Sequence, residues 1–322
     1  MNATLEQIAS KIKKAKSVAI FTHMRPDGDA FGSALSLANA LSDLGIKNQV
    51  CVETDVPSNL AFLDGVDKVL KNPSEPFDLL VCVDCSNVQR LGALSDEFLA
   101  ATRKKIDTVN VDHHISNERF ADFNYVRECA ANCMNVAKLI EHLGAPLSKK
   151  TAEYLLVGLL TDSGNFSHDD VGEEAFALAA KLAAAGADVR YYHYHLFKKQ
   201  SKARAALHAQ VMGKMRYFFD DKFAVITITQ DVMKQCGADN GMTEGFVDFP
   251  LNVDTVEIAA SIMEVDYKKY KISLRSKNYA DVNKLAGTFG GGGHIRAAGC
   301  MLFGDLEEVI DILSYAVSQY LE

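Results

Sequence analysis

The stretch DTVNVDHHIS, residues 107–116, joins a short apolar run to an acid and two adjacent histidines. The β-branched residues of the run predict a buried strand, and neighbouring residues of a strand point to opposite faces. His113 and His114 therefore cannot both pack into one core. An Asp-His-His sequence at the point where a buried strand stops indicates a functional site at the strand end.

Similar apolar runs precede this stretch, and helical patterns alternate with them. Strands are predicted at residues 17–23, 48–54, 78–84 and 107–114, with a short edge strand at 123–127. Helices are predicted at residues 4–15, 28–45, 132–143, 149–160, 173–185 and 189–199. This alternation is typical of parallel βαβ units with right-handed crossovers. We therefore expect an α/β fold, with a doubly wound parallel sheet in an N-terminal domain over residues 1–187.

The composition changes after this domain. From Tyr191 to Arg216 the chain has no Asp or Glu but six Lys or Arg, which predicts a basic helical linker over residues 188–213. Residues 214–322 then predict a smaller α/β domain. Its expected elements are a hairpin turning at Asp220-Asp221, strands at 256–265, 270–276 and 297–303, a helix near 281–288 and a final helix.

Charge and cysteine content narrow the class of protein. The net charge of −8 argues against a binder of long duplex nucleic acid, whose phosphates require a basic surface. The 7 cysteines, an odd number without a Cys-x-x-Cys pair, are typical of reduced thiols. No apolar run has membrane-spanning length, and the N-terminus lacks a signal-peptide core. We therefore expect a cytoplasmic protein without a membrane partner.

Polar residues with metal-binding chemistry follow four of the apolar runs. They are His23, Asp27 and Asp29 after the first run, then Asp84, then Asp112-His113-His114, and finally Asp162 at the end of an apolar helix. In an open parallel sheet the carboxyl ends of the strands meet at one edge, where ligands bind. The first three groups should therefore meet in space, and the helix that ends at Asp162 completes the ring.

Crowded carboxylates repel one another and resist ionisation unless cations are present. Oxygen-rich ligands with a few imidazoles suit Mn²⁺ or Mg²⁺, with Co²⁺ as a further substitute. The candidate ligands are His23, Asp27, Asp29, Asp84, His113 and Asp162. Six protein ligands are too many for one catalytic ion but suffice for two ions that share a carboxylate, and Asp84 is the natural bridge.

Each of these groups also has a simpler interpretation when it is taken alone. Asp27-Gly28-Asp29 is a common turn sequence, and Asp84 or Asp162 could cap a helix. Two adjacent histidines could be a strand end with one buried and one exposed ring. The occurrence of all four groups, each at the end of an apolar run, favours the metal site.

Five motifs of this chain resemble those of a known family. HMRPDGDAFGS, VDCS, VDHHIS and TDSGNF resemble the four motifs of the DHH phosphoesterase family. GGGGHIRAAG, residues 290–299, resembles the signature of the companion DHHA1 domain. The two-domain form is similar to the bacterial subgroup of oligoribonucleases (nanoRNases) and 3'-phosphoadenosine 5'-phosphate (pAp) phosphatases. The resemblance covers nearly the whole chain.

The resemblance implies two Mn²⁺ ions and a role for each motif residue. His23 and Asp27 would bind one ion, Asp84 would bridge, and the second ion would be bound by Asp29, His113 and Asp162. His114 would face the substrate phosphate. Asp112 would orient the two histidines, because metal-ligating histidines usually have such a partner. Asp84, Asp112 and His114 are thus the expected catalytic residues.

The second domain is expected to bind substrate. Consecutive glycines permit a backbone path closed to other residues, and their amides can bind an anion. The candidates are Arg275, which matches a substrate-binding arginine of the family, and Gly291, Gly292, Gly293 and His294. A flexible loop and an exposed strand-end arginine are the alternatives. One departure concerns the fourth motif, where relatives often have Arg after Phe and this chain has Ser167, then His168 and Asp169.

The resemblance implies a metal-dependent phosphohydrolase with the substrate phosphate between its two domains. It would degrade short oligoribonucleotides to nucleoside monophosphates, or convert pAp to AMP, and hydrolysis of cyclic di-AMP or pApA is the alternative. An inorganic pyrophosphatase would carry a Ser-Arg-Lys-Lys-Gln type motif, which the sequence lacks. A RecJ-like exonuclease is disfavoured by the absence of Trp and the charge of −8, and an inactive sensor by the intact ligand set. A homodimer is compatible with the sequence.

Overall fold

The computed structural model describes residues 2–321 and divides the chain into two compact units, Met1–Lys199 and Gln200–Glu322. The division lies inside residues 188–213, and the three predicted domain bounds stay a prediction. Within residues 2–321, no helix combines the length and apolar character needed to cross a membrane. All 7 cysteines are free thiols.

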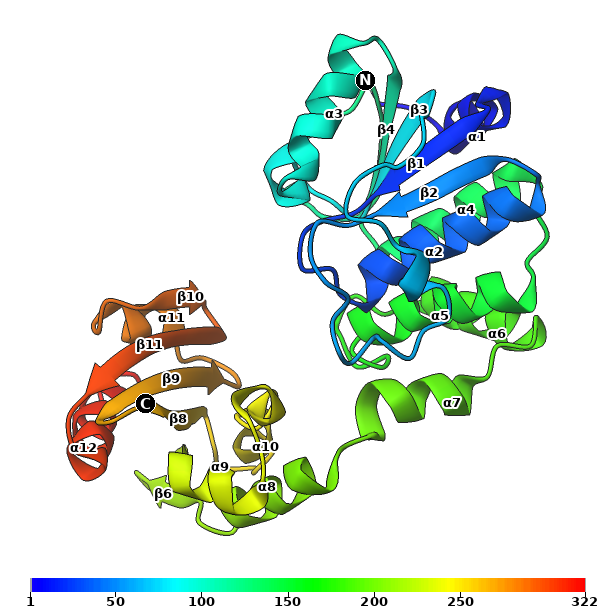
Figure 1. Cartoon of the computed structure of the whole chain (residues 1–322). Coiled ribbons are helices and arrows are strands. Elements are labelled where there is room, and N and C mark those ends of the chain that lie inside the picture. Colours follow the sequence, from blue (N-terminus) through cyan, green and yellow to red (C-terminus); the bar gives the residue numbers. More distant parts are fainter. Residues whose placement is uncertain (1, 322) are drawn as a thin grey trace. The chain divides into compact units, whose positions relative to one another are not determined.

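The first unit contains the expected parallel sheet (Figure 1). Its five strands are all parallel and lie in the order β2-β1-β3-β4-β5. They are β1 (Ser17–Phe21), β2 (Lys47–Cys51), β3 (Leu79–Val83), β4 (Asp107–Asp112) and β5 (Phe123–Val126). The α/β class is confirmed, and β5 is an edge strand as predicted.

Helices cover both faces of this sheet, which explains why its central strands are continuously apolar. Val18, Ile20 and Val81 pack on one face, where the core is shared with α1 (Leu5–Lys14), α2 (Gly28–Asp43), α4 (Asn132–Leu143) and α5 (Lys149–Asp162). Ala19, Phe21 and Cys82 point to the other face and pack with α3 (Leu94–Arg103).

The remaining helical segments of this unit follow α5 or connect strands. They are α6 (Glu173–Ala184), α7 (Val189–His193), a π-helical segment (Tyr194–Lys198) and two 3₁₀ turns (Val66–Lys68 and Val88–Leu91). The sequence predicted a single helix over 189–199 and did not predict α3. Leu94, Phe98 and Ala101 are the buried residues of α3, and their spacing is the signal that could have identified it.

Helices α2 and α5 pack closely because glycines lie at their contact. A Cβ atom on Gly32 would lie 2.6 Å from the backbone oxygen of Tyr154. A Cβ atom on Gly158 would lie 2.5 Å from Oδ1 of Asp29. The two backbones therefore touch without intervening side chains, and this fixes the separation of Asp29 and Asp162 on the two helices.

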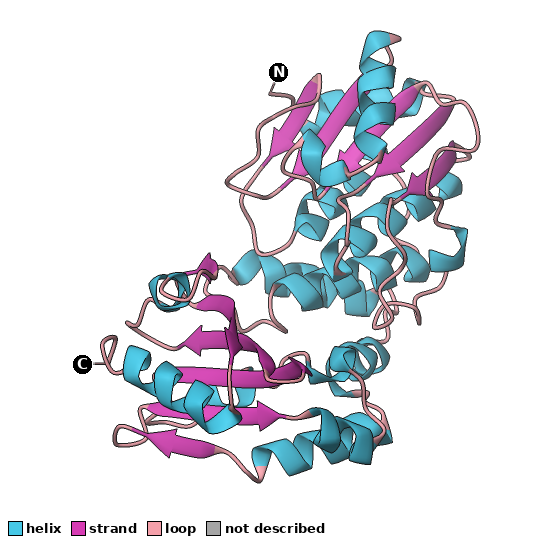
Figure 2. Ribbon diagram, turned by 60° about the vertical axis from the view of Figure 1, so that its left-hand side comes forward, coloured by secondary structure: helices cyan, strands magenta, loops and turns pink. Residues whose placement is uncertain are grey.

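The second unit contains a mixed sheet of six strands in the order β10-β11-β9-β8-β7-β6. Its strands are drawn in magenta in Figure 2. The strands are β6 (Arg216–Phe218), β7 (Phe223–Ile228), β8 (Ile258–Asp266), β9 (Lys269–Ser276), β10 (Gly292–His294) and β11 (Ala297–Phe303). Only β7 and β8 pair in parallel. The hairpin turns at Phe219–Asp221, where all three residues have positive φ.

Helices again lie on both faces of this second sheet. They are α8 (Lys202–Met212), α9 (Gln230–Cys236), α10 (Asp248–Leu251), α11 (Val282–Gly287) and α12 (Leu306–Val317). Leu274 and Ala298 share a core with α11 and α12, whereas Ile226 and Met263 pack with α8 and α9. Helices α9 and α10 and the short strand β10 were not predicted from the sequence.

Candidate metal centre

The predicted metal-binding residues all lie at the carboxyl edge of the parallel sheet or at helix ends beside it. His23 follows β1, Asp84 follows β3, and Asp112 is the last residue of β4. Asp27 caps the N-terminus of α2, so that Asp29 lies in its first turn. Asp162 is the last residue of α5.

These residues form two groups of potential ligands. One ligand atom each from His23, Asp27 and Asp84 lies within 4.8 Å of the others, and the same holds for Asp29, His113 and Asp162. Asp84 faces both groups. Its Oδ2 is 3.6 Å from Nε2 of His23, and its Oδ1 is 3.5 Å from Nε2 of His113. The structure thus brings together all six predicted ligands.

Backbone carbonyls fix the orientation of both histidines. Nδ1 of His23 is 2.9 Å from the oxygen of Met24, and Nδ1 of His113 is 2.8 Å from the oxygen of Cys129. A carbonyl only accepts, so each Nδ1 carries the proton. In neutral rings both Nε2 lone pairs therefore point at carboxylates. A proton or a metal cation is needed between them.

The carboxylate of Asp84 is suited to bind such a cation. The residue is 2% exposed, and its Oδ1 has no hydrogen-bond partner among the described residues. It also has a φ of 53°, which a residue other than glycine adopts at a cost that functional sites often tolerate. A buried carboxylate oxygen without a hydrogen donor, facing two imidazoles, fits a bridging metal ligand.

The pKa values of the acids in the cluster are shifted in opposite directions. Burial raises the pKa of Asp29, and the charges of Asp84 and Asp162 raise it further. Burial also raises the pKa of Asp162, to about 6. Burial acts in the same direction on Asp84, but the neighbouring imidazoles of His113 and His23 outweigh it when they are protonated and hold the pKa of Asp84 below its usual range.

The same carboxylates shift the pKa values of the histidines. Burial would lower the pKa of His113, but the nearby carboxylates of Asp84 and Asp29 raise it to about 10. Burial would also lower the pKa of His23, but the neighbouring carboxylate of Asp84 outweighs burial, so this pKa is raised as well. The cluster therefore favours positive charge at its centre, which divalent cations would supply.

Asp29 is positioned by the start of another helix. Its two carboxylate oxygens accept hydrogen bonds from the backbone N–H groups of Asn132 and Cys133, the first residues of α4. The positive end of the α4 dipole favours the ionised form of Asp29 and opposes the effect of burial. The sequence indicated Asp29 but not these backbone partners.

His114 has a different environment from His113. Its Nδ1 lies 2.8 Å from Oδ1 of Asp112, which is fully buried, and this hydrogen bond raises the pKa of His114. The side chain of Asn117 donates to the other oxygen of Asp112. Asp112 thus orients His114 alone, whereas the carbonyl of Cys129 orients His113. The side chain of His114 is 31% exposed and leaves Nε2 available to a ligand.

The departure in the fourth motif begins five residues after Asp162. Nδ1 of His168 is 2.8 Å from the backbone oxygen of Asp162. Gly164, Asn165 and Phe166 all have positive φ, so the chain turns sharply between these two residues. Ser167 donates to the backbone oxygen of Gly164, and Asp169 is exposed. His168 therefore anchors the end of α5.

In the second unit, strand register places two predicted substrate residues in one row. Arg275 on β9 pairs with Ala297 on β11, and Ala297 pairs with His294 on β10. Paired residues of neighbouring strands point to the same face, so Arg275 and His294 lie two strands apart on one face, about 10 Å between backbones. The small side chain of Ala297 lies between them.

The glycine run is ordered by backbone packing. A Cβ atom on Gly291 would lie 2.2 Å from the backbone oxygen of Gly299, and Gly293 has a φ of 154°. The backbone N–H of Gly293 donates to the side chain of Asn283 over 2.8 Å. Gly292 and Gly293 belong to strand β10, which distinguishes this segment from a flexible loop.

Comparisons with known proteins extend the similarity beyond the motifs. A family model described as the DHH family, N-terminal domain, matches residues 17–159, and one described as the DHHA1 domain matches residues 220–322. A Thermus thermophilus protein named bifunctional oligoribonuclease and PAP phosphatase NrnA is 31% identical over 98% of this chain and 94% of its own length.

Two further relatives are similar over most of their length. A Bacillus subtilis protein with the same name is 25% identical over 89% of this chain and 90% of its own. The crystal structure of an exopolyphosphatase-related protein from Bacteroides fragilis has 27% identity and a TM-score of 0.84. That match covers 98% of this chain and 96% of the other. Both units of the chain therefore have counterparts in the same relatives.

Proposed function

Because this chain belongs to the DHH family of phosphoesterases, we propose that it is a metal-dependent phosphohydrolase that acts through two divalent cations, with Mn²⁺ as the preferred ion. The observation that carries the proposal is the position of Asp84. Its buried carboxylate faces Nε2 of His23 and Nε2 of His113, one in each ligand group. A single acid can therefore hold two ions close together, as two-metal hydrolysis requires.

The ligand assignment follows the two groups. His23 and Asp27 would hold one cation, and Asp29, His113 and Asp162 the other, with Asp84 shared. Bound cations would lower the pKa of a water molecule and stabilise the charge on the phosphoryl oxygens. The protein keeps both histidines in the tautomer that presents Nε2, because backbone carbonyls hold each Nδ1 proton.

We assign His114 to the substrate phosphate. Asp112 holds the Nδ1 proton and raises the pKa of His114, so the ring favours the form that donates from Nε2. A donor at this position can bind a phosphoryl oxygen and stabilise the charge that develops during displacement. Asp112 has a positioning role in this scheme, since it acts through His114.

The proposed substrates are short oligoribonucleotides, pAp, or both. Two relatives similar over most of their length are named for these activities. Arg275 and His294 form a row of donors that could bind a second phosphate or a terminal nucleotide. The net charge of −8 offers little long-range attraction for a long polymer. Cyclic di-AMP and pApA are the alternative substrates.

A panel assay tests the function directly. The purified chain would be stripped with EDTA and assayed with pAp, pApA, cyclic di-AMP and labelled RNA of two to 25 nucleotides, without and with Mn²⁺, Mg²⁺ or Co²⁺. We expect turnover only with added cation, fastest with Mn²⁺, and highest for pAp or for RNA of about two to five nucleotides. Full turnover in the stripped protein would contradict the two-metal proposal, and equal rates on the 25-mer would contradict the proposed substrates.

A further inference from the structure

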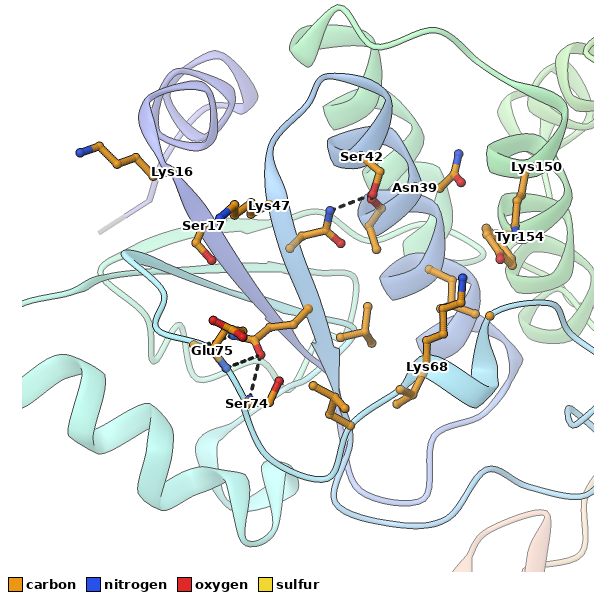
Figure 3. Close-up of a pocket in the computed structure, with 18 of the residues that line it drawn as sticks. Lys16, Ser17, Asn39, Ser42, Lys47, Lys68, Ser74, Glu75, Lys150 and Tyr154 are labelled. Carbon is orange, nitrogen blue, oxygen red and sulfur yellow. Dashed lines mark hydrogen bonds between the residues drawn. The ribbon is translucent and has the colours of Figure 1, made fainter.

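A cavity of about 890 Å³ lies in the first unit at the outer side of β2 (Figure 3). Its walls come from five segments: the start of β1, the second half of α2, strand β2, residues 65–76 and the start of α5. Its size is in the range of pockets that bind small organic ligands. No step of the proposed hydrolysis uses it.

The cavity is remote from the candidate metal centre. Asp29 lies in the first turn of α2, whereas the cavity is lined by Ser42 near the last turn of the same helix. The lining residues of α2 run from Leu35 to Ser42, so about two to four turns, roughly 10–20 Å along the axis, separate Asp29 from them. Likewise, α5 contributes Lys150 from its first turn to the cavity and Asp162 from its end to the metal centre. A ligand here would therefore occupy a separate site.

Positive charge distinguishes this cavity from the rest of an acidic chain. The basic residues that line it are Lys16, Lys47, Lys68 and Lys150, and Glu75 is the one carboxylate among the described lining residues. Within residues 2–321, Lys16, Lys47 and Lys68 form no ion pair. The ammonium of Lys150 lies 5.9 Å from the ring centre of Tyr154. In Figure 3 the side chain of Lys16 extends away from the other lining residues, so Lys47, Lys68 and Lys150 carry the charges available to an anion.

The polar amides around the cavity are already occupied by protein partners. Gln49 accepts from the backbone N–H groups of Ser74 and Glu75 and donates to the backbone oxygen of Glu75. Asn48 donates to the hydroxyl of Ser42 over 3.0 Å. These bonds hold the walls in place, so the lysines are the groups left to recognise a ligand.

The floor of the cavity is apolar and fixed. Leu35 and Val50 line it and are mostly buried, and Val69 adds a further apolar side chain. The hydroxyl of Tyr154 donates to the backbone oxygen of Asp64 over 2.6 Å. This bond ties the turn that carries Lys68 to α5, so the cavity does not need to form around its ligand.

We propose that this cavity binds a small organic anion with a phosphate group and a flat apolar body, the class of the mononucleotides. The lysines would bind the phosphate, and the apolar floor would contact the base. Lys68 and Lys150 are the main determinants, since they lie on the segments joined by the Tyr154 bond. In Figure 3 they stand on the segment after β2 and on α5.

Hydrogen exchange measured by mass spectrometry would locate the site. The full chain would be compared without ligand, with AMP, with adenosine and with inorganic phosphate, each with and without Mn²⁺. We expect AMP to slow exchange about tenfold in residues 44–52 and 64–76, with or without Mn²⁺, and more strongly than adenosine or phosphate. Metal-dependent protection at residues 20–30 and 110–118 would report the metal centre separately, so failure of either proposal is distinguishable.

The variant K68E/K150E tests the assignment. We expect it to lose protection in residues 44–52 and 64–76, and to lower the calorimetric affinity of the metal-free chain for AMP at least about tenfold. Turnover should stay at the wild-type value. K104E/K214E, which reverses two exposed lysines elsewhere, is the control for net charge and should keep both properties. AMP protection confined to the metal centre in wild type, or unchanged in K68E/K150E, would overturn the proposal.

Discussion

Asp84 in the first unit and Glu257 in the second are both buried carboxylates, with exposed fractions of 2% and 4%. Glu257 accepts hydrogen bonds from the backbone N–H groups of Asn278, Tyr279 and Ala280 and from the side chain of Asn278. Asp84 faces two imidazole nitrogens, and its Oδ1 has no hydrogen-bond partner among the described residues.

The difference separates a structural acid from a functional one. Donors of the protein itself hydrogen-bond the Glu257 carboxylate, so this group stabilises a turn next to β8 without a ligand from solvent. Asp84 is held in a conformation of positive φ with its charge only partly compensated. A buried carboxylate that the fold leaves incomplete requires a ligand from outside. A substitution of Asp84 should therefore reduce activity, whereas a substitution of Glu257 should reduce stability.

The largest expected effect is that of Asp84→Asn. Loss of the shared ligand should reduce turnover at least about 1000-fold, because the cations supply several kcal/mol of stabilisation. Bound Mn²⁺, measured by elemental analysis, should fall at both positions, while circular dichroism should be unchanged. Glu257→Gln is the matched control and should keep activity. Two retained ions with near-normal turnover in Asp84→Asn would remove its bridging role.

The two histidines of the motif should separate binding from chemistry. His114→Ala should keep both ions and lose about 100- to 10,000-fold in kcat, the range for one acid–base or electrostatic group. His113→Ala should lose an ion, since its Nε2 faces Asp84 and Asp162. Metal counting and kcat on both variants make the comparison. If His114→Ala loses the ion and His113→Ala does not, the two roles are reversed.

A smaller effect is expected in the row on the second sheet. Arg275→Ala or His294→Ala should remove a contact to phosphate worth about 2–4 kcal/mol. The ratio kcat/KM for a dinucleotide should then fall about 30- to 1000-fold, with metal content unchanged. Hydrolysis of bis(p-nitrophenyl) phosphate should fall much less, because this substrate has no second phosphate or nucleotide.

Arg216→Ala on the edge strand β6 is the control for this pair, since Arg216 pairs with the exposed Glu307. It should leave the kcat/KM of both substrates unchanged. An equal loss for the dinucleotide and for bis(p-nitrophenyl) phosphate in Arg275→Ala would show that the arginine does not select nucleotides.

The smallest effect concerns stability and its pH dependence at Glu257. Burial would raise the pKa of Glu257, but the N–H donors outweigh it and hold the pKa below the usual 4.5. A carboxyl group with a lowered folded pKa stabilises the protein above its unfolded pKa, and the stabilisation is lost as pH falls through the folded value. Glu257→Gln should therefore cost about 1–3 kcal/mol at pH 7.

Thermal unfolding of wild type and Glu257→Gln between pH 7 and pH 3 would measure this. The difference in Tm should shrink as the pH falls below about 4.5, the usual value for this group. A difference that stays constant over this range would indicate a packing effect of the substitution.

The sequence predicted the fold well where apolar runs carry the information. Strands β1 to β5 each follow from a short apolar run with turn residues at its ends, and a parallel sheet follows from their alternation with helices. Helix α3 was missed because only Leu94, Phe98 and Ala101 mark its buried face. The π-helical segment at Tyr194–Lys198 has no sequence signal, because it depends on how the backbone closes its hydrogen bonds.

The site was predictable at the level of side chains and not at the level of their partners. His113 could be identified from its place after a strand, but the carbonyl of Cys129 that orients it belongs to the backbone of a distant segment. The row of Arg275, Ala297 and His294 depends on strand register, which three separate stretches of sequence do not specify. The positive φ of Asp84 has no local signal either.

The glycine contact between α2 and α5 affects the size of the cation that the metal centre can accept. A Cβ atom on Gly158 would meet Asp29, so no side chain there can repack to change the spacing between these helices. Ca²⁺ prefers ligand distances of about 2.3–2.6 Å and more ligands than Mg²⁺, which takes about 2.0–2.1 Å. If the helices moved apart to accommodate the larger ion, a gap would open at this contact and its packing would be lost. Ca²⁺ should therefore be a poor substitute, because widening the site would cost the packing between α2 and α5.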